Sequence, residues 1–488
     1  MAYIKTFQNQ TWLLPPSLKD MIHENHVCFL VEDFVNTLDF ARFDQDYEGP
    51  GHPAYPPRIL MKILLQGMID KTRSSRDLAK ACRENLVFIY LSEKVQPQYR
   101  TIARFRQYNA SLIKEAFKQT VRFASSHNLI DLNLISIDGT FIKANAGQKS
   151  RISKDALELL DKAIDKMIQE DIEIDNLDEE MYGDSEANLT GRDRKNIRKL
   201  LQEFQEKEGK VVVDKVDKLK KEFEKDPNQK RLSLSDPESR VLRNKHNYLQ
   251  PTYNAQFSVD SKNQIIIAND VCQDHNDYDQ LAPQIANIEE NVGPLTEENK
   301  LDLDAGYSSA KNCAFLEEKK LDGYIPTKAQ AQVFKGNYST WKNQKYEYDL
   351  ETDEVIEDGL RFQYLSTRLD KGKKVMRYRN KATKRIKRLP VGFQAALRMR
   401  DKMETEDAKE IYSKRKHIVE PAIGNIKHNL DFREFLTRGI NSAKIELNLV
   451  SIAHNLKKVW KYGRTGVEAV SKGTAMQNLF LRFRLFTC

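Results

Sequence analysis

Two aspartates follow short apolar runs that have the composition of β-strands. Asp138 comes after residues 134–137, and Asp304 comes after Leu301-Asp302-Leu303. Because side chains alternate along a strand, Asp302 and Asp304 share one face, and spacing alone does not choose between them. A carboxylate at the edge of an apolar strand is costly to desolvate without a partner, and a metal ion is a frequent partner.

A third carboxylate, Glu420, lies in a basic stretch between Arg415 and Lys427. An acid among cations can hold a metal ion while its neighbours grip phosphate. Three carboxylates from two strands and a helix could hold two Mg²⁺ or Mn²⁺ ions about 4 Å apart and support phosphoryl transfer. The alternative is that they are turn and cap residues, since the chain has 71 acids from which to choose.

Hydrophobic periodicity predicts the elements that would position these carboxylates. We expect strands over 134–142, 253–259, 264–271, 300–304 and 323–326. We expect helices over 278–290, 309–319, 405–428 and 442–460. Three strands followed by alternating helices and strands indicate an α/β domain with a mixed central sheet.

The N-terminal part, to residue 127, has the pattern of short helices joined by turns. One helix begins at Pro57, a second is capped by Ser74, and a third is expected from Thr101 through Val121. Arginines recur on these helices: Arg73, Arg76, Arg100, Arg104 and Arg106. The pattern is typical of a helix-turn-helix-like DNA-binding domain, and the alternative is a helical bundle with solvated arginines.

Two segments carry opposite charge within a chain of net charge +8. Residues 361–400 contain fourteen Lys or Arg against one acid, and residues 155–186 contain thirteen acids against two Lys. The basic segment, in a region of strands and loops, predicts sequence-independent affinity for a nucleic-acid backbone; the alternative is a solvated basic loop. The acidic segment lies in a charged region whose narrow apolar stripe indicates a helical hairpin or short coiled coil, and we expect it not to contact DNA.

Composition excludes several classes of protein. With 488 residues and 40% hydrophobic residues the chain can bury a large core, and no apolar run approaches the roughly 20 residues of a membrane helix. The first ten residues have no signal-peptide core. Five scattered cysteines without a CxxC pair argue against a disulfide framework or a zinc ribbon. We expect a cytoplasmic, nucleoid-associated protein without a membrane partner.

The sequence resembles bacterial insertion-sequence transposases of the DDE class, in particular those with a helical InsH-type N-terminal domain. In the N-terminal part the resemblance rests on Tyr55-Pro56-Pro57-Arg58-Ile59-Leu60, Ser74-Ser75-Arg76 and Thr101-Ile102-Ala103-Arg104-Phe105-Arg106. Further on it rests on Ile137-Asp138-Gly139-Thr140, Asp236-Pro237-Glu238-Ser239-Arg240, Tyr253-Asn254-Ala255-Gln256, Asp304-Ala305-Gly306-Tyr307, Val419-Glu420-Pro421 with Gly424 and Lys427, and Ala453-His454-Asn455-Leu456.

The resemblance implies a multidomain chain with an all-α DNA-binding domain and a ribonuclease-H-like α/β catalytic domain. The DNA-binding domain would span 1–127. The catalytic domain would comprise 128–145, 251–328 and 404–440, interrupted by a charged helical insertion over 146–250 and a basic insertion over 329–403. A helical segment over 441–488 would follow. Many relatives carry a cysteine-bearing segment before the final helix; residues 329–403 contain no cysteine, so we expect no zinc there.

The resemblance also assigns the site. The catalytic and metal-binding triad would be Asp138, Asp304 and Glu420, which selects Asp304 over Asp302 because the family's second aspartate precedes Ala-Gly-Tyr. The residues expected to bind DNA are Arg76, Arg104, Arg106, Tyr412, Arg415, Lys416, Lys427, Lys384, Arg385, Lys387 and Arg388. Lys416 is an alternative to Arg415, because the gap from Arg415 to Glu420 is one residue longer than in the relatives with the tightest pattern.

The expected function is that of a DDE transposase, an endonuclease and strand transferase that uses two Mg²⁺ or Mn²⁺ ions per active site. Its expected partners are double-stranded DNA, as inverted element ends and target, and a second copy of the chain in a dimer or higher oligomer, with 146–250 a candidate interface. The alternatives are a nuclease of the same fold that never joins strands, and a non-catalytic DNA-binding regulator. The sequence leaves open whether Asp270, Asp274 or Asp277 assists at the site.

Overall fold

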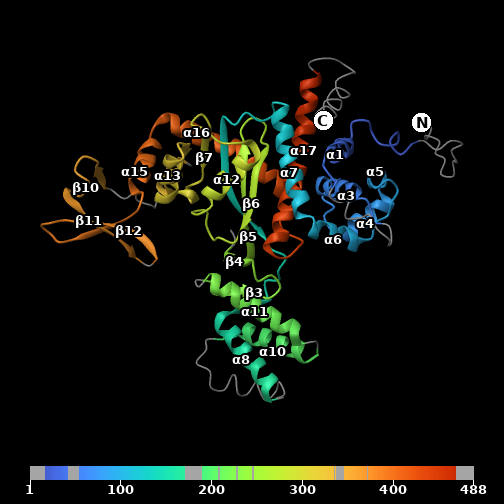
Figure 1. Ribbon diagram of the computed structural model, residues 1–488, viewed down its shortest axis with the longest axis horizontal. Helices are drawn as coiled ribbons and strands as arrows, with labels where there is room; N and C mark the ends of the chain where they lie inside the picture. The colour runs from blue at the N-terminus through green and yellow to red at the C-terminus, as the bar shows by residue number, and fades with distance from the viewer. Residues whose placement is uncertain are drawn as a thin grey trace, which may run out of the picture. The chain divides into compact units, whose positions relative to one another are not determined.

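The computed structural model of the chain describes residues 17–41, 54–170, 189–206, 209–226, 229–243, 247–334, 336, 346–370 and 372–468 (Figure 1). Residues 171–186, which are half of the acidic segment over 155–186, and Cys488 therefore lie outside the described residues. The described residues fall into two compact units. One comprises those within 1–111 and 459–488, and the other comprises those within 112–458.

The first unit is helical. Its helices are α1 (Val27–Asn36), α3 (Pro57–Ile69), α4 (Ser75–Glu84), α5 (Leu86–Leu91) and α6 (Tyr99–Tyr108). The predicted cap is confirmed, because the Ser74 side chain accepts a hydrogen bond from the Asp77 backbone N–H. The prediction of one helix from Thr101 through Val121 is wrong. The side-chain amide of Asn109 donates to the Phe105 carbonyl at 2.7 Å, competing with the helical backbone, and α7 (Ala110–Ser126) begins after this break.

The second unit is built on a mixed sheet. Its strands are β1 (Leu134–Lys143), β4 (Arg240–Arg243), β5 (Leu249–Asp260), β6 (Ile266–Cys272), β7 (Lys300–Leu303) and β8 (Asp322–Tyr324). The order is β4-β5-β1-β7-β8, with β6 also pairing β5. Strand β5 pairs antiparallel with β1, β4 and β6. Strand β7 pairs parallel with β1 and with β8. The five strands predicted from periodicity are confirmed, and β4 is an addition.

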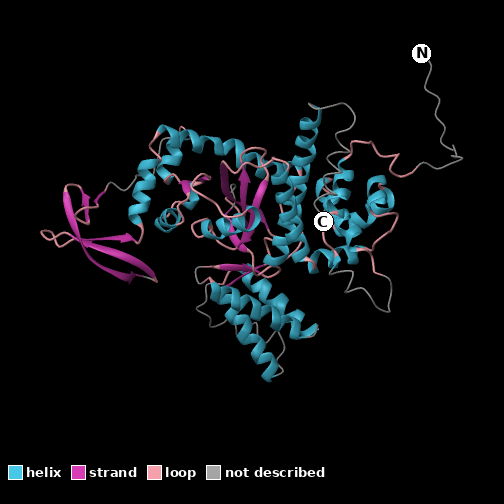
Figure 2. Ribbon diagram, turned by 45° about the horizontal axis from the view of Figure 1, so that its top comes forward, coloured by secondary structure: helices cyan, strands magenta, loops and turns pink. Residues whose placement is uncertain are grey.

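Helices pack on this sheet and join its strands (Figure 2). Helix α12 (Leu281–Val292) contacts β5 and β6, and α16 (Glu406–Gly424) contacts β1, β5 and β7. Helix α13 (Ala310–Glu318) precedes β8. The predicted helix over 405–428 is observed as α16 followed by one π-helical turn, η2 (Asn425–Asn429). The helix predicted over 442–460 is observed as part of α17 (Ile440–Glu468).

The Ala-His-Asn-Leu motif of α17 completes the hydrogen bonding of an edge strand. The Asn455 side chain accepts from the Ile266 N–H and donates to the Ile266 carbonyl, both at 2.9 Å. It thereby serves both backbone groups of one residue on β6, which pairs with β5 alone. Next to it, buried His454 contacts the Gln264 carbonyl through Nε2 at 2.8 Å and the Asn425 amide through Nδ1 at 2.9 Å. The motif therefore joins α17, the sheet and the start of η2.

Two insertions have apolar cores of their own. The first contains the strands β2 (Arg151–Ser153) and β3 (Arg231–Ser233) and the helices α8 (Lys154–Glu170), α10 (Gly191–Glu206) and α11 (Gly209–Lys225). It is larger than the predicted hairpin or coiled coil, because three helices share one core. The second insertion is a five-stranded antiparallel sheet in the order β13-β12-β11-β10-β9, between α14 (Lys328–Phe334) and α15 (Phe393–Lys402). Its strands are β9 (Glu347–Asp349), β10 (Glu354–Glu357), β11 (Leu360–Asp370), β12 (Lys373–Arg379) and β13 (Ile386–Pro390).

Across the part of the chain that the structure describes, none of the helices combines the length and the apolar composition needed to cross a membrane.

The buried imidazole of His454 predicts a pH-dependent loss of stability. Burial lowers its pKa from 6.5 to about 4, so the fold favours the neutral ring. The contribution is complete above pH 6.5 and is lost as pH falls from 6.5 towards 4, by roughly 3 kcal/mol in total. We expect His454→Gln, whose amide can make both hydrogen bonds, to flatten the pH dependence of the unfolding free energy in this window. Urea titrations of both proteins at pH 4.5 and 7 measure the difference, and parallel pH profiles would contradict the assignment.

Candidate active site

The carboxylates of Asp138, Asp304 and Glu420 meet at one buried guanidinium. Arg415 on α16 places Nη2 2.5 Å from Asp138 Oδ2, and its Nη1 lies 3.8 Å from Asp304 Oδ1 and 3.8 Å from Glu420 Oε1. Asp138 lies in β1 where burial along the strand decreases, and Asp304 directly follows β7. Since β1 and β7 are adjacent and parallel and α16 packs on both, the fold brings together residues that are 282 positions apart in the sequence.

Burial sets the electrostatics of this group. The Arg415 side chain is 7% exposed and that of Asp138 is 15% exposed, whereas the Glu420 side chain is half exposed. The pKa of Asp138 is raised to about 7, chiefly by desolvation and also by the negative charges of Asp304 and Asp277, while the positive charge of Arg415 acts in the opposite direction. Although burial opposes its charge, the pKa of Arg415 is raised above its ordinary value by Asp138 and Asp304. Arg415 and Asp138 are thus poorly solvated, whereas Asp304 and Glu420 extend from them towards solvent.

Asp302 and Asp304 occupy different environments. Asp302 is fully buried, pairs in register with Ser136 of β1, and accepts a hydrogen bond from the Ser136 hydroxyl at 2.7 Å. Burial raises the pKa of Asp302 to about 7. Asp304 is 34% exposed and lies 3.4 Å from the Tyr412 hydroxyl, which donates to it. Of the two, Asp304 is therefore the carboxylate that a ligand could reach.

A fourth carboxylate, Asp277, lies against the backbone beside the triad. Its Oδ1 accepts from the Asn254 amide at 2.8 Å and from the Gln256 amide at 2.6 Å. The side-chain oxygen Oε1 of Gln256 in turn accepts a hydrogen bond from the Tyr307 hydroxyl. The Tyr-Asn-Ala-Gln and Ala-Gly-Tyr motifs therefore meet at Asp277, with two amides and a phenol holding it in place.

Two glycines leave room for Asp277. A Cβ on Gly139 would lie 2.4 Å from Asp277 Oδ1, and a Cβ on Gly306 would lie 3.0 Å from Asp277 Oδ2. Gly139 directly follows Asp138, and Gly306 lies two residues after Asp304. The glycine that follows each aspartate is the sequence signal for a closely packed neighbour, although it does not show that the neighbour is Asp277. The sequence predicts Asp138 at the end of an apolar run, whereas β1 continues through Lys143.

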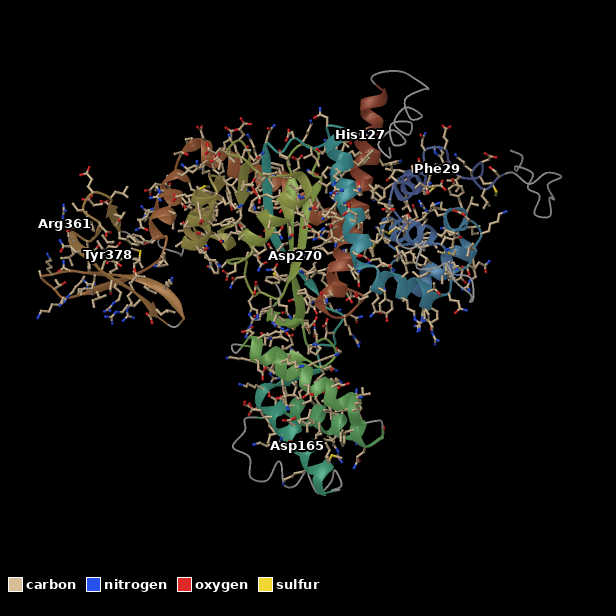
Figure 3. All side chains as sticks on the ribbon, viewed as in Figure 1. Phe29, His127, Asp165, Asp270, Arg361 and Tyr378 are labelled. Carbon is tan, nitrogen blue, oxygen red and sulfur yellow. The ribbon has the colours of Figure 1, made fainter. Side chains whose placement is uncertain are left out.

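The other two acids near β6 have partners elsewhere. Asp270, which is labelled in Figure 3, places Oδ1 2.7 Å from Nζ of Lys444 on α17. Asp274 accepts a hydrogen bond from the Gln280 amide. Among Asp270, Asp274 and Asp277, the last is the one that raises the pKa of Asp138.

The basic residues around Glu420 divide into buried and exposed groups. Arg415 points into the triad, whereas Lys416 is exposed, so Arg415 is the one that contacts the carboxylates. Burial and Asp304 raise the pKa of Tyr412, which keeps its hydroxyl protonated as a donor. Lys427 donates to Thr140 Oγ1 at 2.5 Å and to the Phe141 carbonyl at 3.2 Å, which fastens η2 to β1 just beyond Asp138.

The N-terminal arginines also divide. Arg76 and Arg104 are exposed, and the Arg76 guanidinium lies 5.3 Å from the centre of the Tyr99 ring. Arg106 is 7% exposed and donates to the Arg73 carbonyl at 3.3 Å. Arg106 therefore packs α6 against the turn that precedes α4, and its guanidinium does not face solvent.

The cations of the five-stranded sheet β9–β13, here called the basic sheet, differ in their exposure; Figure 3 labels Arg361 and Tyr378 in this sheet. Lys384 and Arg385 are exposed, and Arg388 is exposed while lying 3.3 Å from Asp370. The Lys387 side chain is 13% exposed, pairs with Glu357 at 2.5 Å and lies 4.1 Å from the centre of the Tyr346 ring. Lys387 is thus part of the packing of the sheet.

The described residues contain no group of three or more His, Cys, Asp or Glu side chains close enough together to hold a metal ion. Each of the three carboxylates lies within 4 Å of the Arg415 guanidinium. Their donor set is nevertheless that of a hard divalent cation, since all three supply oxygen and they already share one cation. The residues fit Mg²⁺ or Mn²⁺ in kind, with Arg415 at the point where their negative charge is concentrated.

Comparisons with known proteins point to one family. A family model described as a transposase domain (DUF772) matches residues 16–108, and one described as a transposase DDE domain matches residues 373–460. Among curated proteins, none matches the chain. A cryo-EM structure of a piggyBac transposase synaptic complex with hairpin DNA aligns at 9% identity and a TM-score of 0.33, covering 96% of this chain and 82% of that chain; a score this low does not establish a shared fold.

The packing of Asp277 predicts that Gly139→Ala is destabilising. The added methyl group would displace Asp277 or the Gln256 amide, 2.5 Å away, and overpacking of this kind costs about 1–3 kcal/mol. Gly424→Ala is the matched control, because Gly424 is helical and its Cβ would meet nothing within 4 Å, so it should gain about 0.5–1 kcal/mol. Urea unfolding measures both, and equal stabilities would contradict the close packing at Gly139.

Proposed function

We propose that this chain cuts DNA at the ends of its element and joins each freed 3′-OH to target DNA. By its two matched domains the chain belongs to the DDE transposases of insertion sequences. The observation that carries the proposal is the meeting of Asp138, Asp304 and Glu420 at Arg415. The resemblance of the sequence selects the same three acids from 71. The enzyme is then a polynucleotidyl transferase with endonuclease and strand-transfer steps.

In this proposal Asp138 and Asp304 would hold the metal ions, and Glu420 would complete the set of carboxylate ligands. Two Mg²⁺ or Mn²⁺ ions bound there would activate the attacking oxygen and stabilise the leaving oxygen. The partial burial of Asp138 limits the water around the carboxylates and strengthens their attraction for a cation. Tyr412 orients Asp304 through its hydroxyl, and Arg415 keeps the three acids together by balancing their charge.

Cations beside the triad would hold the DNA backbone. Lys416 is exposed next to Arg415, and Lys427 is fixed to β1 beyond Asp138, so both are suited to contact phosphates that flank the reacting bond.

The antiparallel strand pairing, followed by two parallel strands, supports the ribonuclease-H-like assignment of the catalytic domain.

End recognition is assigned to the N-terminal helices. The exposed arginines Arg76 and Arg104 are candidates for DNA contacts, whereas buried Arg106 supports their helix from behind. In the basic sheet, Lys384, Arg385 and Arg388 are exposed and suited to sequence-independent contacts with phosphate. Synapsis of two element ends implies a dimer or a higher oligomer.

Strand joining distinguishes this proposal from a nuclease of the same fold. The full chain is incubated with a pre-cleaved element end and a supercoiled plasmid in Mg²⁺ or Mn²⁺. We expect covalently joined product with either ion and none after chelation with EDTA. Cleavage of an intact end without any joining of the pre-cleaved end would favour the nuclease, and binding without either reaction would favour the regulator.

The triad assignment predicts a large effect of Asp138→Asn. Loss of a carboxylate that would hold the metal ions should reduce joining by more than about 100-fold. Asp279→Asn is the control, because Asp279 is 66% exposed and pairs with Lys311, and it should keep at least half of the wild-type rate. Product quantified on denaturing gels measures both. Wild-type joining by Asp138→Asn would remove Asp138 from the triad.

A further inference from the structure

A groove on the helical insertion is lined mainly by cations. Its volume is about 350 Å³, and it lies where α10, α11 and the segments next to β2 and β3 come together. The charged side chains that line it are Lys149, Arg192, Lys195, Lys199, Lys215 and Glu203. Five cations therefore face one carboxylate in this groove.

That carboxylate is divided between two ammonium groups. Glu203 lies 3.8 Å from Lys199 and 3.9 Å from Lys215, distances at the outer limit of an ion pair. Burial and the nearby positive charges of Lys199 and Arg438 lower the pKa of Lys215, while Glu203 acts in the opposite direction. Among the described residues that line the groove, positive charge therefore exceeds negative charge.

The position of the cations on α10 is unfavourable for the helix itself. Arg192 lies in the first turn of α10, where the helix dipole disfavours positive charge, and Lys195 follows in the next turn. The acid of the first turn, Asp193, is fully buried and accepts hydrogen bonds from the Ser153 N–H and the Thr190 hydroxyl. Because Asp193 is directed to the interior, the solvent face of this helix start is left to cations, an arrangement that an anionic ligand would stabilise.

A second groove on the same insertion shows the contrast. It has a volume of about 720 Å³ and is also lined by α11. Its cations Lys218, Lys221, Lys225 and Arg438 are matched by the acids Glu222, Glu224, Asp236 and Glu238. The surplus of positive charge is therefore a property of the first groove and not of the whole insertion.

We propose that the groove formed by α10 and Lys149 binds the sugar-phosphate backbone of duplex DNA, without reading its sequence. Arg192, Lys195 and Lys199 follow the i, i+3, i+7 spacing of one helix face and extend about 10 Å along it. That length matches about three phosphates of one strand. The insertion, which the sequence alone predicts not to contact DNA, then adds a second backbone contact to that of the catalytic domain. The proposal depends on the proposed function in one respect only: whether the duplex in the groove is an element end or target DNA.

The test compares two triple variants of the full chain that remove equal charge. One is Arg192→Gln, Lys195→Gln and Lys199→Gln in the cationic groove. The other is Lys218→Gln, Lys221→Gln and Lys225→Gln in the charge-balanced groove. Binding of a labelled 30-base-pair duplex without element sequence is followed by fluorescence anisotropy in EDTA, from 50 to 300 mM KCl. Helical content from circular dichroism verifies that each variant is folded, and glutamine suits helix interiors.

We expect the α10 variant to reduce the slope of log K against log salt by about 2 to 3, since each lost phosphate contact removes about 0.9. The α11 variant should change the slope by less than about 1. Equal changes in both variants, or no change in the first, would overturn the proposal. Because the duplex lacks element ends and the metal is chelated, a chain that fails to join strands but shows this difference contradicts only the proposed reaction. A chain that joins strands without showing it contradicts only the groove.

Discussion

The charge balance around Arg415 is the interaction on which the candidate site depends. A guanidinium that is 7% exposed needs compensating charge, because an unpaired buried cation is strongly destabilising. Asp138, Asp304 and Glu420 supply that charge from β1, from the end of β7 and from α16. The pairing of β1 with β7 and the packing of α16 on both strands are therefore coupled to the site's electrostatics. Any cation that replaced the guanidinium would meet the same three acids.

Space next to the triad is as restricted as charge. Gly139 and Gly306 allow Asp277 to reach the backbone beside Asp138 and Asp304, and the amides of Asn254 and Gln256 hold it there. Short motifs that are far apart in sequence thus have one physical explanation, since each contributes either room or a hydrogen bond to the same carboxylate. Negative charge from Asp277 in turn raises the pKa of Asp138 and increases the need for the cation that Arg415 now provides.

Local patterns in the sequence predicted most of the elements, whereas individual side-chain contacts, some local and some between distant residues, decided the rest. Alternation identified the five strands, and Ser74 identified the start of α4. The break at Asn109 depends on one side-chain hydrogen bond that periodicity does not detect. The structure brings together the three acids chosen from the sequence. Asp277 lies in the loop between β6 and α12, which has no distinctive sequence pattern, and only the tertiary fold places it beside two glycines.

Burial, more than net charge, decides which cations are available to a polyanion. The sequence treats Arg106 and Lys387 as equivalent to their neighbours, yet Arg106 donates to a buried carbonyl and Lys387 is paired with Glu357 under an aromatic ring. Conversely, α10 follows an acidic segment in the sequence but presents cations along one face of the helix. In a chain of net charge +8, acids directed inward, such as Asp193, leave positive charge on the surface. Electrostatic attraction for DNA therefore depends on which partners each cation has in the fold. The net charge summed over a sequence segment underestimates this attraction at the cationic groove and overestimates it at Lys387.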